Sequence, residues 1–331
     1  MNCTETVRLL SSSSPNASLL PLAQTILGEL ESALQKWTVL VRPDCYPNYN
    51  AFLAAFCARG GVIEAVPLNL KGNPCANILI EPNGVVTVVS THEKTFSSQF
   101  RNSGGIFPQR CVPGPAIYGA SKALGNVLFQ NGIFGYVQID YVVWLDKQTR
   151  LPTLWAVDLN IELTRTASSF WLFDFLMNGR FDPVGGRYLV EKPSGETVSN
   201  PELAMVLSQK QTKKREWEER HYIFTDYILY PQMSSLHFAS FFNLCRLEGV
   251  SYDTRMKSGT IFMLIDALAG GVFGLMCIST KATKAAKLMW DNMVFIKKQV
   301  GITSFNEVAE GPKSNFATIM RSVRRILQKH E

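Results

Sequence analysis

Two acidic residues and one amide lie inside a stretch that otherwise reads as two apolar β-strands. The stretch is QIDYVVWLDKQTRLPTLWAVDLNIELT, residues 138–164, and it holds Asp140, Asp158 and Asn160. Apolar and aromatic runs joined by a polar turn predict a β-hairpin. If the turn is centred near Thr149, Asp140 faces Asp158, and Asn160 lies on the same side because side chains alternate along a strand.

Two facing carboxylates repel each other, so a stable hairpin needs something that offsets this repulsion. Directly opposed Cβ atoms lie about 5 Å apart, where two like charges destabilise a sheet. A shared proton or a cation between the acids removes that cost. Two carboxylates and an amide oxygen suit Mg²⁺, which keeps waters and phosphate oxygens as its other ligands. The sequence therefore predicts a magnesium site at Asp140, Asp158 and Asn160.

A second interpretation stays open on geometry alone. The two aspartates can lie on the solvent face of an edge hairpin. The opposite face would then pack on the core through Ile139, Tyr141, Val157, Leu159 and Ile161.

The surrounding sequence predicts the elements that must position this hairpin. Helical spacing of apolar residues is found at 20–37, 51–60, 116–132, 171–181, 281–300 and 315–331. Strand-like runs occupy 37–41, 62–68, 76–82, 85–91, 221–230 and both halves of 260–279. The pair Asn83-Gly84 is typical of a hairpin turn. Helices that alternate with hairpins favour an α+β fold with antiparallel sheets over a doubly wound parallel sheet.

The composition is that of an ordinary globular protein, with 46% hydrophobic residues among 331 and a formal net charge of +6. The mild basicity permits an anionic ligand such as a nucleotide. Seven scattered cysteines predict buried thiols rather than a zinc site or a disulfide framework. The GxSxG, HExxH, Walker A and GxGxxG patterns are absent, which argues against hydrolase, zincin, P-loop and Rossmann functions.

The run from 260 to 279 is long enough to span a membrane. Asp266 and the pair Gly270-Gly271 interrupt it, so two strands joined by a turn fit the sequence better. The N-terminus lacks the apolar segment of a signal peptide. We therefore expect a cytoplasmic protein without a membrane partner.

The hairpin resembles the metal-binding hairpin of the ATP-grasp superfamily, in which Asp140, Asp158 and Asn160 match the magnesium ligands. This resemblance implies ATP and Mg²⁺ as cofactors. The segment WTVLVRP resembles the strand that carries a phosphate-contacting cation, with Arg42 in place of the usual lysine. The segment GGVIEAVPL resembles the hinge that holds adenine, which implies contacts from Glu64 and from the backbone of Ala65, Val66 and Leu68.

A narrower resemblance covers nearly all of residues 20–300. The order of ILIEPNGVVTVVSTHEK, GIFPQ, the hairpin and GTIFMLIDALAGGVFGLMCIS is similar to the pheganomycin-type peptide ligases. It is also similar to the ATP-grasp-like region of the IQ motif-containing protein H family, sperm proteins linked to calmodulin and RNA. The resemblance implies a nucleotide-binding region at 20–187 and an appended region at 188–331. The Ser-rich composition around SSSSPNAS predicts a disordered leader at 1–19.

Several departures from the ATP-grasp pattern weaken the expectation of catalysis. Glu162 stands where these ligases place a phosphate-contacting arginine, and Arg165 is expected to leave from a different part of the strand end. No glycine-rich loop follows Arg42, and the lobe that normally precedes the ATP-binding part is not found. We expect a nucleotide-binding module with weakened or no catalysis. The alternatives are an active carboxylate–amine ligase that forms an acylphosphate, and a structural partner-binding domain without nucleotide.

Two further features allow a functional and a structural interpretation. His92 can act as a general base or serve as a structural histidine beside a strand end. The terminal segment 315–331 is basic and amphipathic, of a type that docks in a calmodulin groove. It can equally pack its apolar stripe on the domain and leave its basic residues in water. RNA binding follows from the resemblance alone.

Overall fold

The computed structural model describes residues 28–30, 32–67, 69–98, 100–146, 149–192, 216–235, 237–264, 270–303 and 314–329. The chain divides into two compact units, Met1–Val66 and Pro67–Glu331. The predicted leader at 1–19 lies outside the described residues.

The first unit contains helix α3 (Tyr49–Arg59), which begins where the Asn48 side chain accepts a hydrogen bond from the Ala51 amide. The helix ends at Gly60, whose φ of 75° lies in the region that glycine adopts without strain. No residue of α3 is buried. The helix that precedes it in the sequence extends to residue 37.

Two predicted strands of this unit are wrong. Residues 38–42 and the described part of 62–68 have no regular structure. Both runs are apolar, yet Val39 and Ile63 are exposed, Ile63 by 89%. A strand forms only where another strand satisfies its backbone hydrogen bonds, and among the described strands none pairs with either run.

The second unit is built on a large antiparallel sheet. Its described strands follow the order β1 (Leu70–Gly72), β5 (Gly135–Leu145), β2 (Pro74–Ile80), β3 (Val86–Ser98), β4 (Arg101–Phe107), β10 (His221–Leu229), β13 (Val272–Ser279), β12 (Ser258–Met263) and β11 (Tyr252–Asp253), and β6 (Pro152–Asn160) pairs with β5. The α+β prediction with antiparallel sheets is therefore confirmed.

The hairpins form where the sequence predicts them. Ile80 pairs with Val86 across the Asn83-Gly84 turn, and Asp140 pairs with Asp158 between β5 and β6. The apolar run at 260–279 supplies β12 and β13, which pair with each other. Among the described residues, no helix is both long enough and apolar enough to cross a membrane.

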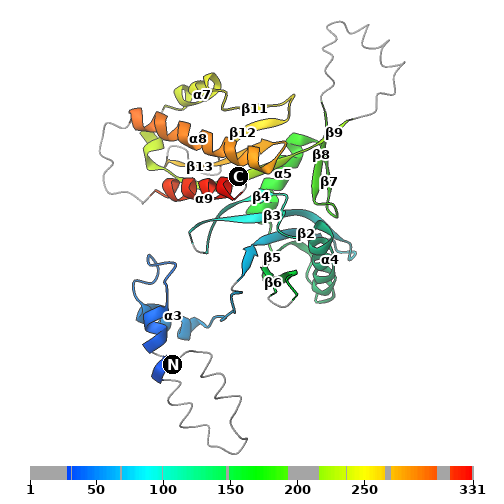
Figure 1. Cartoon of the computed structure of the whole chain (residues 1–331), viewed down its shortest axis with the longest axis vertical. Helices are drawn as coiled ribbons and strands as arrows, with labels where there is room; N and C mark the ends of the chain where they lie inside the picture. The colour runs from blue at the N-terminus through cyan, green and yellow to red at the C-terminus, as the bar shows by residue number, and fades with distance from the viewer. Residues whose placement is uncertain are drawn as a thin grey trace, which may run out of the picture. The chain divides into compact units, whose positions relative to one another are not determined.

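Helices and a small sheet cover the two faces of the large sheet (Figure 1). One face packs against α4 (Gly114–Gln130), α8 (Ala282–Thr303) and α9 (Phe316–Gln328), which bury the side chains of Ile78, Ile139, Ile223 and Leu275. The other face packs against α5 (Arg165–Met177) and the small sheet β7 (Arg180–Asp182), β8 (Arg187–Glu191) and β9 (Trp217–Glu219). The 3₁₀ helix η1 (Pro231–Ser235) and helix α7 (Phe238–Leu247) bury Met233, Phe241 and Cys245 in the core on the α8 side.

Helix α9 packs its apolar stripe against the core next to α8 (Figure 1). Phe316, Ile319 and Val323 are buried, and the Phe316 ring stacks on Tyr230 with 4.3 Å between centroids. Arg321, Arg324 and Arg325 are exposed. The structural interpretation of this segment therefore accounts for its amphipathic pattern.

The packing of α9 predicts a stability effect. Ile319→Ala removes buried methyl groups and should lower the free energy of unfolding by about 2–5 kcal/mol. Arg324→Ala on the exposed side of the same helix should change it by about 0.5 kcal/mol or less. Chemical denaturation monitored by circular dichroism measures both, and equal effects would contradict the docking of α9.

Candidate functional site

Polar side chains gather on the face of the sheet that packs against α5. Residues that pair across the strands share a face, so His92 and Lys94 of β3 lie on the same side as Asp140 of β5. Lys94 and Asp140 border an open pocket of about 220 Å³ on this face. Its lining residues are Lys94, Asn102, Gly104, Gln138, Asp140, Asn160, Glu162, Thr164, Arg165, Thr166, Phe224 and Asp226.

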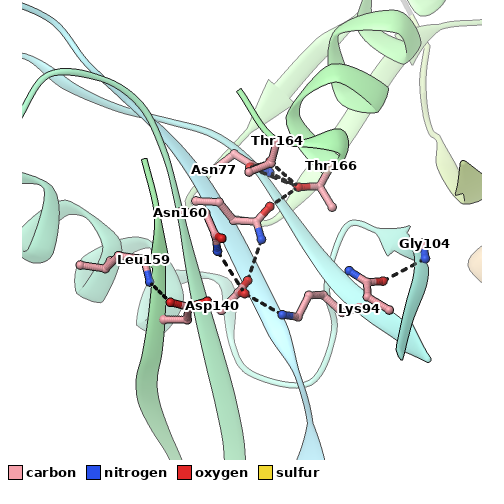
Figure 2. A network of polar contacts seen from close by, with 11 residues as sticks. Asn77, Lys94, Gly104, Asp140, Leu159, Asn160, Thr164 and Thr166 are labelled. Carbon is pink, nitrogen blue, oxygen red and sulfur yellow. Dashed lines mark hydrogen bonds and ion pairs between the residues drawn. The ribbon is translucent and has the colours of Figure 1, made fainter. Parts of the chain in front are cut away.

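Asp140 is one of two buried acids that line this pocket, with 6% of its surface exposed. Its Oδ2 accepts a hydrogen bond from Lys94 Nζ at 2.7 Å and a longer one from Asn160 Nδ2 at 3.4 Å. Its Oδ1 accepts a hydrogen bond from Gln138 Nε2 at 2.7 Å (Figure 2). The ammonium group of Lys94 supplies the counter-charge that a buried carboxylate requires.

The first turn of α5 is tied to the same cluster. Thr164 caps the helix by accepting a hydrogen bond from the Ala167 amide. The Thr166 hydroxyl lies 2.5 Å from Gln138 Oε1, and Thr164 donates to Asn77 Oδ1 at 2.9 Å (Figure 2). These contacts join β2, β5 and α5, so the N-terminus of α5 faces the pocket, where its partial positive charge favours an anion.

Arg165 is the second cation of the pocket. Its Nη1 donates to Asp226 Oδ2 at 3.0 Å. Asp226 comes from β10, which β2, β3 and β4 separate from β5 in the sheet. The expectation that Arg165 leaves from a different part of the strand end is wrong, because Arg165 and Glu162 line the same pocket. The chain turns into α5 directly after β6 and thereby carries Arg165 back over the sheet.

The predicted metal residues are brought together only in part. Asp140 and Asn160 converge, whereas Asp158 is exposed and does not line the pocket. Asp158 Oδ1 instead accepts a hydrogen bond from the Leu159 amide at 2.8 Å. The register of β5 and β6 shifts directly after the Asp140–Asp158 pair, which distorts the hairpin at this position.

The side chains of this pocket provide part of a magnesium coordination shell. Within the described part of the chain, no group of three His, Cys, Asp or Glu side chains could hold a metal ion. Asp140 and Asn160 can supply two oxygen ligands, which suffices for Mg²⁺ when phosphate oxygens and waters complete its shell. Lys94 now occupies one oxygen of Asp140, so the ion would have to displace it.

Four of the predicted nucleotide contacts, Arg42, Glu64, Ala65 and Val66, belong to the first compact unit. Arg42 is exposed and pairs with Asp44 at 2.7 Å. Glu64, Ala65 and Val66 are exposed and have no regular structure, and Leu68 lies outside the described residues.

The sequence interpretation missed Lys94, Gln138, Thr164, Thr166 and Asp226 as members of the cluster. Asp226 is the one of these residues that the sequence pattern could have indicated. Asp226 interrupts the apolar strand YIFTDYIL, as Asp140 interrupts β5. The hydroxyl and amide groups carry no such signal, because polar residues of these types are common on surfaces.

His92 lies behind the pocket and has a structural environment. Its Nε2 lies 2.6 Å from the Tyr222 hydroxyl, and the rings of Phe107 and Phe224 surround it. Burial lowers the pKa of His92 to about 3, so the ring is neutral at physiological pH. Since His92 does not line the pocket, these contacts favour the structural interpretation over a general base.

The lowered pKa of His92 predicts a pH dependence of stability. The unfolded chain binds a proton at His92 below about pH 6.5, whereas the folded protein resists protonation down to about pH 3. Stability is therefore lost as the pH falls through this window. Between about pH 7.5 and pH 5, the wild type should lose about 1–2 kcal/mol more than His92→Gln.

Urea denaturation at the two pH values measures this difference, and the effect of other buried acids such as Glu93 cancels between the two proteins. An equal loss in both would show that His92 is protonated in the folded state.

Comparisons with known proteins agree with the resemblance inferred from the sequence. The family model described as IQCH-like, ATP-grasp matches residues 11–184. IQ motif-containing protein H from Danio rerio is 22% identical over 308 residues, which cover 91% of this chain and 26% of that protein. The chain thus spans about a quarter of the length of this curated relative.

Two solved structures are similar to this chain at low sequence identity. The biotin carboxylase–β,γ-ATP complex from Campylobacter jejuni has a TM-score of 0.45 at 9% identity, covering 86% of this chain and 56% of that chain. The biotin carboxylase domain of the Hydrogenobacter thermophilus 2-oxoglutarate carboxylase, in complex with MgADP and bicarbonate, has a TM-score of 0.47 at 10% identity. That match covers 83% of this chain and 54% of that chain.

Proposed function

The chain belongs to the IQCH-like ATP-grasp family, and we propose from this premise that its second unit binds a Mg²⁺–nucleotide at the Asp140 pocket with weakened or no catalysis. The phosphates would lie near Lys94 and Arg165. Asp140 and Asn160 would hold the ion, with Asp158 as a further candidate ligand. Arg42, Glu64, Ala65, Val66 and Leu68 stay nucleotide contacts proposed from the resemblance, and the proposed site in the second unit does not depend on them.

The observation that carries the proposal is the burial of Asp140 beside a solvent-open pocket. A carboxylate that only stabilises a sheet has no need of a cavity of about 220 Å³ beside it. Here the acid, its amide neighbours and two cations all face that space. Magnesium, when bound, would neutralise phosphate oxygens that the protein's own side chains do not reach.

The charge of the pocket supports weakened catalysis. Lys94 and Arg165 are each paired with an aspartate, and among the described residues Glu162 has no ion-pair partner. Phosphoryl transfer depends on positive groups that neutralise the charge of the transferred phosphate. An unpaired carboxylate at this place repels that charge, so nucleotide binding survives more readily than transfer.

The first test removes the charge of Asp140. Asp140→Asn should weaken the binding of Mg-ATP about tenfold or more, because a charge-assisted ligand becomes a neutral one. Isothermal titration calorimetry measures the affinity, and Asp291→Asn, an exposed acid on α8, is the matched control. Binding that is equally strong in wild type and Asp140→Asn would remove the basis of the proposed site.

A second test reverses the charge of Glu162. Glu162→Arg should raise the affinity for Mg-ATP about tenfold, since it replaces repulsion with attraction at a phosphate site. The same titration measures it, with Glu191→Arg as a control for net charge. Lower affinity in Glu162→Arg would indicate that Glu162 itself helps to hold the ligand or its ion.

An active carboxylate–amine ligase is the alternative function. The proposed hairpin residues and the resemblance to peptide ligases favour it, whereas Glu162 opposes it. Sustained ADP release by the wild type with pools of carboxylates and amines would establish the ligase and contradict the binding-only proposal.

We keep calmodulin, through residues 315–331, and RNA as proposed partners of a cytoplasmic protein. The buried stripe of α9 limits the first proposal, because a calmodulin groove would need Ile319 and Val323 to leave the core. The exposed arginines of α9 remain accessible to an acidic partner while the helix stays docked.

A further inference from the structure

The two ion pairs of the pocket differ in how they are buried. Lys94 and Asp140 are both shielded, with 15% and 9% of their side chains exposed. Asp226 is equally shielded at 7%, but its partner Arg165 is 75% exposed. The guanidinium therefore extends from a fixed acid into open water at the side of the pocket.

Arg165 has hydrogen-bonding capacity left over. A guanidinium group carries five N–H donors in a planar fork. Within the described part of the chain, only Nη1 donates a hydrogen bond, to Asp226 Oδ2. The remaining donors are free for a ligand, and a phosphate group accepts two of them side by side.

We propose that Arg165 is the phosphate-binding residue of the pocket and that Asp226 is the residue that positions it. The inference rests on the proposed nucleotide site and names its phosphate contact. Arg165 lies three residues beyond Glu162 and provides the cation that position 162 lacks.

Asp226 is suited to this role because its carboxylate is buried, with 7% of its side chain exposed. It lies at the irregularity of the β10–β13 register between Thr225 and Ile228, next to residues of β10 that pair with β4 and with β13. Breaking the pair would leave the buried carboxylate without its counter-charge, which is strongly unfavourable. Arg165 therefore stays bonded through Nη1 while its other nitrogens bind the ligand, with less loss of side-chain freedom than a free arginine would suffer.

The test is a double-mutant cycle on the full chain, with Mg²⁺-pyrophosphate as the probe in isothermal titration calorimetry. Arg165→Gln should raise the Kd about tenfold or more. Asp226→Ala should raise it by about three- to tenfold, through loss of orientation. In the Arg165→Gln background Asp226→Ala should add nothing, because the residue that it positions is gone.

The pair Arg187 and Asp182 provides a matched control. It is another arginine–aspartate pair of the same unit, with 50% and 37% of the side chains exposed, and it does not line the pocket. Arg187→Gln and Asp182→Ala should leave the Kd unchanged. Far-UV circular dichroism checks that Asp226→Ala keeps its secondary structure. Asp226→Asn, which keeps an oxygen acceptor, should show the smaller effect.

Chemical modification gives a second readout. Phenylglyoxal reacts with exposed arginines, and peptide mapping by mass spectrometry follows each site. Mg²⁺-pyrophosphate and Mg-ATP should each protect Arg165 and leave Arg187 reactive. Reaction at Arg165 that neither ligand slows would overturn the proposed contact.

The outcomes separate this inference from the proposed function. Unchanged Mg-ATP affinity in Arg165→Gln, together with a loss in Asp140→Asn, would overturn the role of Arg165 and leave the nucleotide site standing. Binding of pyrophosphate through Arg165 without any preference for ATP would support the inference and contradict a nucleotide site. Tighter binding in Asp226→Ala, in both backgrounds, would show that Asp226 only repels the ligand and does not position Arg165.

Discussion

The ion pair between Asp140 and Lys94 is the interaction on which the pocket depends. A carboxylate in the middle of a sheet is tolerated only with a counter-charge and hydrogen bonds to its oxygens. Lys94 comes from β3, and between it and Asp140 lies β2, so the pair spans three strands of the sheet. Gln138 and Asn160 bond the remaining positions on the carboxylate. Asp140 and Lys94 thus form a charged sheet surface that lines the solvent-open pocket.

Helix α5 packs on the same face of the sheet, and its first residues complete the lining of the pocket. Hydroxyl groups of its first turn reach Asn77 and Gln138, so the helix start is fixed to two strands at once. Its aromatic side chains, Phe170 and Phe173, pack on Phe107 and Tyr222 below. Because the apolar contacts hold the helix down, its polar first residues are free to face the cavity. Arg165 owes its position to this arrangement.

The sequence predicted correctly the elements that depend on local patterns, and it failed where a strand needs a partner strand from elsewhere in the chain. The Asn-Gly hairpin, the Asp140–Asp158 pair and the amphipathic helices α8 and α9 follow from turn chemistry and periodicity. The predicted β5–β6 register holds from Gln138 to Asp140 and shifts by one residue from Tyr141 on. The run at 37–41 and the described residues 62–67 are as apolar as the true strands. They form no strand, because no described strand pairs with them. Asp158 faces Asp140 as expected, but its side chain remains in solvent on an edge strand.

By itself the sequence determined that this protein has an α+β fold with antiparallel hairpins, and that an acid stands at position 140 of an apolar strand. It also pointed to the ATP-grasp family through the order of its segments. Only the tertiary structure decided which groups share a pocket with that acid. Lys94 bonds Asp140, whereas Thr166 and Asp226 line the same pocket, and all three lie far from Asp140 in the chain. They arrive through strand order and helix packing, which single-strand periodicity does not encode. The same packing turned Arg165 toward the pocket, because the direction of a side chain after a strand end depends on where the next helix docks.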